Sequence, residues 1–200
     1  MQDPVDGGGS EDLTLVRAAA AGDRSAMDAI VLAHQAAVLR LARGLARTEA
    51  AAEDVLQETF LAAFRHLGEY RGDGPLRGWL LAIAHRTAVR QGRRRAGEPK
   101  ETEPLEALGE AAGHGAAPMW HPADPEDRAA QAERREALAA ALDTLSPDDR
   151  TVLVLRDLEG LGGPEVARIL AIGVPAMKTR LHRARLRLLA ALRKGGLDAT

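Results

Sequence analysis

The sequence predicts an all-α protein made of two small helical domains that a flexible linker joins. Aromatic residues make up only 2% of the chain, and the runs of β-branched and aromatic residues that are typical of strands are absent. Apolar residues recur instead every three or four positions, which is the spacing of one helix face. One segment rich in Gly, Pro and acidic residues interrupts this pattern. We therefore expect domains at residues 10–96 and 130–195, with the linker at 97–129.

The first domain is expected to contain four helices with recognisable ends. Ser10 begins the first helix, and Gly22 ends it. Asp23 and Thr48 are placed to cap the second and third helices. Pro75 suits the first position of the fourth helix, because the N–H that proline lacks would have had no partner there. This fourth helix ends in a cluster of arginines.

The second domain is predicted to be a helix-turn-helix that two further helices precede. Residues 130–145 form the first of these, and Ser146 with Pro147 is a strong start signal for the next. A short helix at 163–170, a three-residue turn and a longer basic helix at 174–189 follow. This order of elements is typical of proteins that place the last helix in the DNA major groove.

The formal net charge of −2 hides a strongly polarised chain. Residues 163–195 contain eight Lys or Arg against one acid, a net charge of +7, whereas residues 96–128 contain two against eight, a net charge of −6. We therefore expect the first of these segments to meet nucleic acid and the second to be a solvated linker.

Composition also excludes several kinds of site. Cysteine is absent, so disulfides, thiolate zinc sites and cysteine nucleophiles are excluded. His114 and His121 lack a compact ligand set, and we expect no metal and no other cofactor. No apolar run is long enough to span a membrane, and the first residues do not resemble a signal peptide. The protein is therefore expected to be cytoplasmic, without membrane insertion.

The helix at 174–189 has the face pattern of a DNA reader. Steps of about 100° per residue place Met177 and Leu181 on a stripe that packs, and Thr179 and His182 on the opposite side. Short hydrogen-bonding side chains framed by cations suit the major groove, where cations meet phosphates and outer residues meet base edges. A solvated basic helix is the alternative for this segment taken alone. The candidate DNA-binding residues are Lys178, Thr179, Arg180, His182, Arg183 and Arg185.

Four motifs occur in order along the chain: AEDVLQETFL at 52–61, YRGDGPLRGWL at 70–80, LSPDDRTVLVLR at 145–156 and KTRLHRAR at 178–185. Together they resemble bacterial sigma factors of the sigma-70 superfamily, extracytoplasmic-function class. The first domain is similar to sigma domain 2 and the second to sigma domain 4. The family usually has Leu-Gly-Ile at the helix-turn-helix connection, whereas this chain has Ala171 at the central position.

The resemblance implies a transcription initiation factor that binds core RNA polymerase, through its beta and beta-prime subunits, directs it to specific promoters and assists DNA melting. It implies that the polymerase is bound by Asp54, Gln57, Glu58 and Phe60. The minus-ten element would be recognised and melted by Tyr70, Arg71, Asp73, Arg77, Trp79, Arg86 and Arg90. The helix at 174–189 would read the minus-thirty-five element. An anti-sigma factor is implied as a further partner, and the protein would associate with the nucleoid when it is bound to polymerase.

Two of these assignments have a structural alternative: Phe60 is equally explained as a core residue, and a tryptophan at the position of Trp79 is more often a core residue in such a helix. An unpaired base that stacks on an aromatic ring recovers roughly 1–3 kcal/mol, which is comparable with the cost of unstacking it. The cluster of aromatics beside arginines therefore supports a role in melting, and Tyr70 is preferred to Trp79 as the ring on which a base stacks.

Two other functions compete with this one. A stand-alone LuxR-like helix-turn-helix regulator would use its first hundred residues to sense a signal or to dimerise, but it needs neither the 52–61 helix nor the second basic region. An enzyme would have to use His34, His66 or His85. No recognised catalytic motif accompanies these histidines, so we expect no enzyme.

Overall fold

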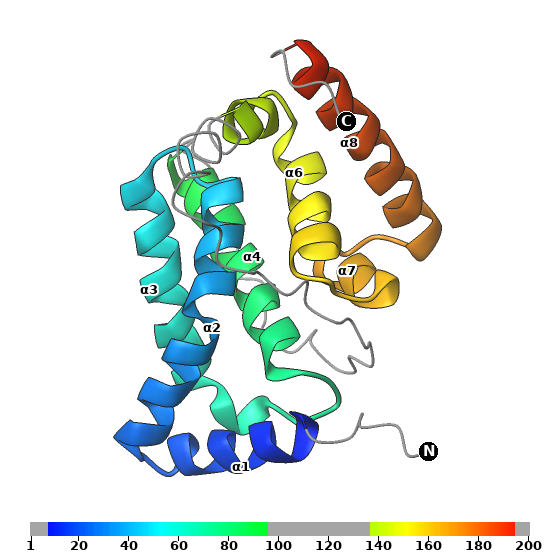
Figure 1. The fold of residues 1–200 in the computed structure, drawn as a ribbon. Helices are drawn as coiled ribbons and strands as arrows, with labels where there is room; N and C mark the ends of the chain where they lie inside the picture. Colours follow the sequence, from blue (N-terminus) through cyan, green and yellow to red (C-terminus); the bar gives the residue numbers. More distant parts are fainter. Residues whose placement is uncertain (1–7, 96–136, 195–200) are drawn as a thin grey trace, which may run out of the picture. The chain divides into compact units, whose positions relative to one another are not determined.

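The computed structural model describes residues 8–95 and 137–194, which belong to two compact units, Met1–His114 and Gly115–Thr200 (Figure 1). All regular secondary structure in these described residues is helical, as the sequence predicts. The predicted linker at 97–129 lies outside them, and so do the first residues of the helix predicted at 130–145.

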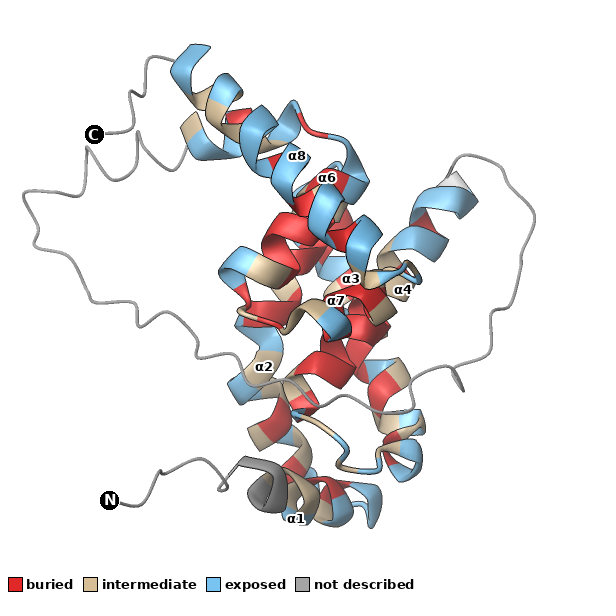
Figure 2. Ribbon diagram, turned by 90° about the vertical axis from the view of Figure 1, so that its right-hand side faces the viewer, coloured by how far each residue is buried: buried red, intermediate tan, exposed pale blue. Residues whose placement is uncertain are grey.

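The first unit is a helical domain in which three helices pack against one another and a fourth covers one end. Its elements are α1 (Gly8–Ala20), α2 (Arg24–Leu45), α3 (Glu49–Arg65), the short 3₁₀ helix η1 (Leu67–Glu69) and α4 (Leu76–Arg95). Each of α2, α3 and α4 contacts the other two, while α1 contacts α2 and η1 (Figure 1). The buried stripes of these helices form the core (Figure 2), with Ile30, Leu41, Val55, Leu80 and Ile83 fully or almost fully buried.

Asp23 and Thr48 cap α2 and α3 as predicted, whereas α1 begins at Gly8, two residues before the predicted start at Ser10. The Asp23 carboxylate accepts the backbone N–H of Ser25 at 2.8 Å, and Gly22 before it has a φ of +94°. The Thr48 hydroxyl accepts a backbone N–H of the first turn of α3 at 3.2 Å. Pro75 was predicted as the first residue of the fourth helix, but it directly precedes that helix, because α4 begins at Leu76. The Pro75 carbonyl accepts the backbone N–H of Gly78 at 3.0 Å.

The loop before α4 is held against α1. An oxygen of the Asp12 carboxylate accepts the backbone N–H of Leu76 at 3.0 Å, so α1 supplies both a cap and a negative charge at the start of α4. Gly72 has a φ of +79°, and a Cβ at this position would lie 2.8 Å from the side chain of Leu13. The loop therefore needs glycine here for its backbone conformation and for its close approach to α1.

The second unit contains the helix-turn-helix. Residues 137–143 are helical, and α6 (Pro147–Leu153), the π-helical turn η4 (Val154–Leu158), α7 (Gly163–Ile169) and α8 (Val174–Lys194) follow. Both α6 and α7 contact α8. The predicted start at Ser146 is confirmed, because its hydroxyl accepts the backbone N–H of Asp149 at 3.2 Å. The helix continues to residue 158 as predicted, with its last turn widened to a π-helix.

The turn between α7 and α8 is closed by backbone bonds. The N–H of Ala171 donates to the carbonyl of Arg168 at 3.0 Å, and the N–H of Ile172 donates to the carbonyl of Ala167 at 2.9 Å. These are the two bonds of a Schellman motif, which requires a left-handed residue directly after the helix. Ala171 takes that conformation, with a φ of +52°. The turn thereby fixes the direction in which α8 leaves α7.

Candidate nucleic-acid interfaces

The predicted faces of α8 are confirmed. Met177, Leu181 and Ala184 are buried, whereas Thr179 and His182 are exposed. Arg183 is exposed as well, and helical geometry places it on the same outer arc. The buried stripe packs on α6 and α7, so α8 presents this outer arc to solvent.

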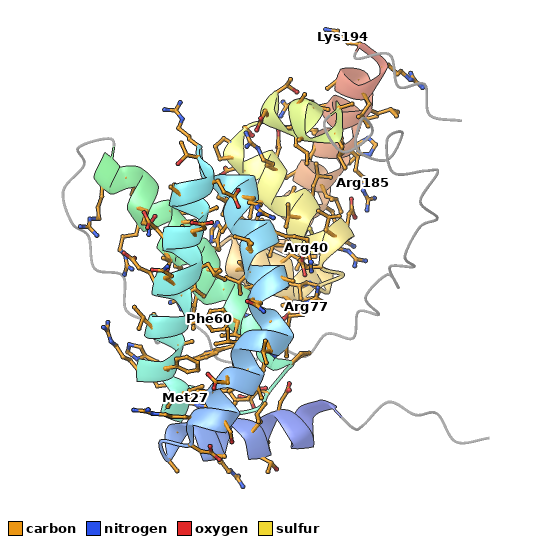
Figure 3. All side chains as sticks on the ribbon, turned by 60° about the vertical axis from the view of Figure 1, so that its left-hand side comes forward. Met27, Arg40, Phe60, Arg77, Arg185 and Lys194 are labelled. Atoms are coloured by element: carbon orange, nitrogen blue, oxygen red, sulfur yellow. The ribbon has the colours of Figure 1, made fainter. Side chains whose placement is uncertain are left out.

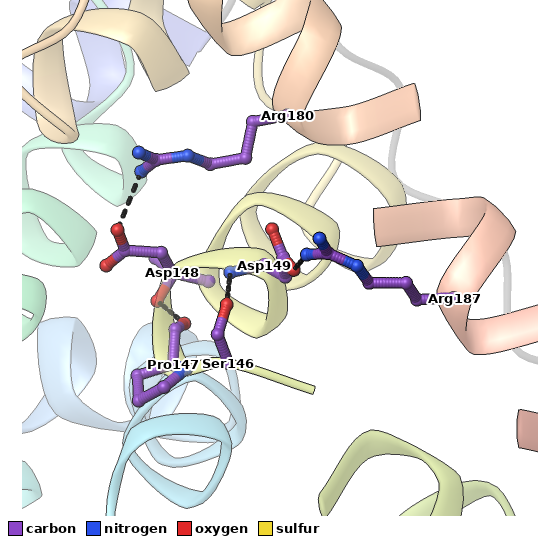
Figure 4. Close-up of polar contacts among 7 residues, drawn as sticks. Ser146, Pro147, Asp148, Asp149, Arg180 and Arg187 are labelled. Atoms are coloured by element: carbon purple, nitrogen blue, oxygen red, sulfur yellow. Dashed lines mark hydrogen bonds and ion pairs between the residues drawn. The ribbon is translucent and has the colours of Figure 1, made fainter. Parts of the chain in front are cut away.

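Three arginines lie on the edges of the buried stripe, and each pairs with an aspartate of α6 or of η4, the π-helical turn that follows it. Arg180 lies 3.1 Å from Asp148, and Arg187 pairs with Asp149, whose side chain is only 6% exposed (Figure 4). Arg185 binds Asp157 with two hydrogen bonds, of 2.9 and 2.5 Å, and this carboxylate raises the pKa of Arg185. Two of the candidate DNA-binding residues, Arg180 and Arg185, are thus engaged within the unit.

The remaining candidates on α8 are open to a partner. Lys178, His182 and Arg183 are exposed, and none of them makes an ion pair with another described residue. The Thr179 hydroxyl donates to the Pro175 carbonyl at 3.0 Å and keeps its lone pairs available. The outer arc therefore offers two cations, an imidazole and a hydroxyl, which are suitable for phosphates and base edges.

In the first unit, an aromatic pair stands at the loop before α4. The rings of Tyr70 and Trp79 are tilted by 58°, with centroids 5.7 Å apart. Trp79 is 9% exposed and belongs to the core, whereas Tyr70 is half-buried. The Tyr70 hydroxyl donates to the Gly74 carbonyl at 2.6 Å, and burial together with Asp12 and Asp73 raises the pKa of Tyr70 to about 12. The tyrosine is therefore a neutral ring that is fixed in place and partly open to solvent.

Arginines flank this pair in the sequence and continue along α4. The helix contains six arginines, and no acid occurs between Asp73 and Glu98. Arg71 and Asp73 of the loop are exposed, Arg77 (Figure 3) and Arg86 are partly buried, and Arg90 is exposed. Arg90 pairs with Glu58 of α3 at 3.1 Å. The predicted minus-ten residues thus lie on one loop and on the helix that follows it.

The predicted docking residues on α3 do not all face outward. Asp54 and Gln57 are exposed, and the Glu58 side chain is 39% exposed. Phe60 (Figure 3) is only 6% exposed and lies with its ring centroid 6.1 Å from that of Phe64, so its burial favours the core alternative.

The sequence interpretation missed Leu61, which is 55% exposed. It follows Gln57 and Glu58 by one turn and therefore shares their face. The helical spacing of Asp54, Gln57 and Leu61 was the signal that could have identified it.

The histidines proposed for an enzyme do not form a site in the described residues. Burial lowers the pKa of His34, and Nδ1 of His66 lies 2.7 Å from the Glu69 carboxylate. No group of three or more metal-ligating side chains occurs in the described ranges 8–95 and 137–194. None of the helices described there is both long enough and apolar enough to cross a lipid bilayer.

Both units match families of known proteins. The first matches the sigma-70 region 2 family over residues 30–98, and the second matches the sigma-70 region 4 family over residues 135–188. The chain is 34% identical, over 177 residues, to the ECF RNA polymerase sigma factor SigM of Mycobacterium tuberculosis. The matched region covers 88% of this chain and 82% of SigM.

Solved structures with the same fold include that of CnrH in complex with the cytosolic domain of CnrY, with a TM-score of 0.63 and 28% identity. This similarity covers 92% of the present chain and 97% of CnrH. The sigma factor RpoE in complex with the anti-sigma factor NepR, from Bartonella quintana, has a TM-score of 0.61 and 22% identity, over 83% of the present chain and 96% of that chain.

Proposed function

Since the chain belongs to the sigma-70 family of RNA polymerase sigma factors, in the extracytoplasmic-function class, we propose that its two units divide promoter recognition between them. The protein is a transcription initiation factor. The region 2 match at 30–98 argues against a stand-alone LuxR-like regulator, which has no use for a polymerase-docking and melting domain.

The second unit reads duplex DNA through the outer arc of α8, and the observation that carries this assignment is the pairing pattern of its cations. Arg180 and Arg185 are held by Asp148 of α6 and Asp157 of η4, so they stabilise the position of α8 against these two elements. Arg183 is exposed and makes no ion pair with another described residue. We assign base contact to Arg183 with Thr179 and His182, and phosphate contact to Lys178.

The first unit opens the minus-ten element through the loop before α4. Tyr70 provides the ring on which an unpaired base stacks, and Trp79 supports that ring from the core. Exposed Arg71 and Arg90, with the partly buried Arg77 and Arg86, follow the single-stranded backbone. Polymerase binding falls to the exposed face of α3, with Leu61 in place of the buried Phe60.

Partners and location follow from this function. The chain binds core RNA polymerase and promoter DNA, and we propose an anti-sigma factor as its regulator. Two structural neighbours, CnrH and RpoE, were each solved with a protein partner, which supports this part of the proposal. A factor that acts at chromosomal promoters works in the cytoplasm and associates with the nucleoid while it is bound to polymerase.

Run-off transcription tests the proposed function. Core polymerase with the protein should give transcripts from promoter fragments of the host genome that core polymerase alone does not transcribe. A protein that binds these fragments tightly by itself, and adds nothing to core polymerase, would be a regulator of another kind.

The residue assignment on α8 is tested by comparing Arg183→Ala with Arg180→Ala in the assembled polymerase. Loss of a bidentate base contact costs about 1–3 kcal/mol of promoter binding and reduces discrimination between sequences. Arg180→Ala should cost less, because an exposed ion pair contributes about 1 kcal/mol or less. Equal losses of affinity and of discrimination in the two variants would refute the assignment.

A further inference from the structure

One ion pair connects two surfaces that the proposed function keeps separate. Glu58 lies on the exposed face of α3, which is assigned to polymerase binding. Arg90 lies on α4, which is assigned to single-stranded DNA. Their side chains meet at 3.1 Å, Nη2 of Arg90 donating to Oε2 of Glu58, across the contact between the two helices. In the free chain, Glu58 therefore neutralises a cation of the DNA surface, and Arg90 neutralises an anion of the polymerase surface.

The pair is exposed enough to exchange partners. The Arg90 side chain is 53% exposed and the Glu58 side chain 39%. A carboxylate at this distance cancels much of the attraction of the guanidinium for a phosphate, so DNA must compete with Glu58 for Arg90. A polymerase group that donates to Glu58 would release Arg90 instead. An exposed ion pair shifts such an equilibrium by up to about fivefold.

We propose that the Glu58–Arg90 ion pair weakens the binding of single-stranded DNA by the free chain and is exchanged when α3 binds core polymerase. The inference rests on the proposed function, because it takes polymerase as the partner of Glu58 and single-stranded DNA as the partner of Arg90. Coupling of this kind is reciprocal: DNA that takes Arg90 also leaves Glu58 more available to polymerase. Through this pair, the binding of either partner thus raises the affinity for the other by a few-fold.

The chain offers a closely matched control. Glu49 is also on α3 and pairs with Arg43 of α2 at 2.5 Å, and the side chains of both residues are 54% exposed. This second pair involves no residue of the proposed DNA surface. Glu49→Gln therefore removes the same charge from the same helix and breaks an ion pair of similar exposure, without changing the surroundings of Arg90.

The experiment measures the binding of a fluorescent oligo(dT) strand to the full chain without polymerase, over a range of salt concentrations. Glu58→Gln should tighten binding about two- to fivefold and should steepen the salt dependence by up to about 0.7 in log–log slope, the value for one added phosphate contact on a single strand. Glu49→Gln should change neither quantity by as much.

A double-mutant cycle then decides whether the effect passes through Arg90. In an Arg90→Gln background, Glu58→Gln should have no further effect on oligo(dT) affinity. An equal gain in both backgrounds, or no gain in the native one, would overturn the inference. Saturating core polymerase should abolish the gain, because Glu58 is then occupied in the native protein, and a gain that persists would also contradict the exchange.

Run-off transcription with the native protein tests the proposed function independently of the oligo(dT) measurements. Absence of transcripts would refute the proposed function whatever the oligo(dT) affinities are. Transcription by the native protein, together with unchanged oligo(dT) binding by Glu58→Gln, would refute the ion-pair inference alone.

Discussion

Substitution of Ala171 by glycine should stabilise the second unit, although most changes from alanine to glycine destabilise helical proteins. Ala171 is exposed, and its backbone has a φ of +52° as the residue that closes the Schellman motif after α7. A residue with a Cβ is disfavoured there by about 1–2 kcal/mol. Glycine removes that cost but gains freedom in the unfolded chain, which offsets about 0.4–1 kcal/mol. The net stabilisation expected is about 0.5–1 kcal/mol.

Hydrogen exchange of α7 and α8 in the full chain measures this effect within the second unit. A gain of about 1 kcal/mol slows exchange that occurs through unfolding of this unit by roughly fivefold. Ala190→Gly is the matched control, because Ala190 is an exposed residue inside α8 and glycine costs about 1 kcal/mol at such a position. The same chemical change should thus slow exchange at one site and accelerate it at the other.

A faster exchange for Ala171→Gly, similar to that of the control, would refute the reasoning. It would mean that the left-handed conformation of Ala171 is not strained, and that the effect of glycine on stability comes only from the greater entropy of the unfolded chain. The result also bears on DNA recognition, since this turn sets the direction of α8. A glycine variant that is more stable but binds promoters less tightly would show that the alanine restricts the turn to the conformation that suits DNA.

Three further predictions concern caps and titration. Ser146→Ala removes the side chain that accepts the Asp149 N–H, which should cost about 1 kcal/mol and accelerate hydrogen exchange in α6. Burial lowers the pKa of His34 below its ordinary 6.5, so the unfolded chain takes up the proton first as the pH falls. The unfolding free energy should therefore decline below about pH 6.5, and His34→Gln should remove that part of the decline. Because the chain contains one tyrosine, its tyrosinate absorbance should stay flat through about pH 10 in the native protein and should rise there in denaturant, since the pKa of Tyr70 is raised to about 12.

Local signals predicted the helices well because each depends on a few neighbouring residues. Asp23, Thr48 and Ser146 cap α2, α3 and α6 as predicted, since a short side-chain acceptor directly before a helix lies within reach of the unpaired backbone N–H groups of the first turn. The periodicity of α8 likewise identified Met177 and Leu181 as buried. The widening of η4 to a π-helix, in which the Glu159 N–H donates to the Val154 carbonyl at 2.8 Å, had no counterpart in the local sequence signals.

The limits of the prediction appear at α3, where two helix faces carry apolar residues. Phe60 and Leu61 are adjacent, and both suit a docking surface by composition. Which of them faces outward depends on where α2 and α4 lie, and packing buries Phe60 while leaving Leu61 exposed. A family motif identifies the helix that we propose for docking, but it does not by itself separate the residues that support this helix from those that would touch a partner.

The charged residues of α8 also show that sequence composition alone does not identify the groups that are open to a partner. Cations on α8 were predicted to line the DNA-binding face, but Arg180 and Arg185 find their aspartates 32 and 28 positions earlier in the chain. Such pairs form only after the helices pack, so a local charge count overestimates the cations that are open to DNA. Arg90, paired with a glutamate of another helix, repeats the pattern in the first unit. The net charge of +7 over residues 163–195 is therefore an upper limit on what this helix-turn-helix offers a promoter, and exposed Lys178 and Arg183 become the residues whose removal should matter most.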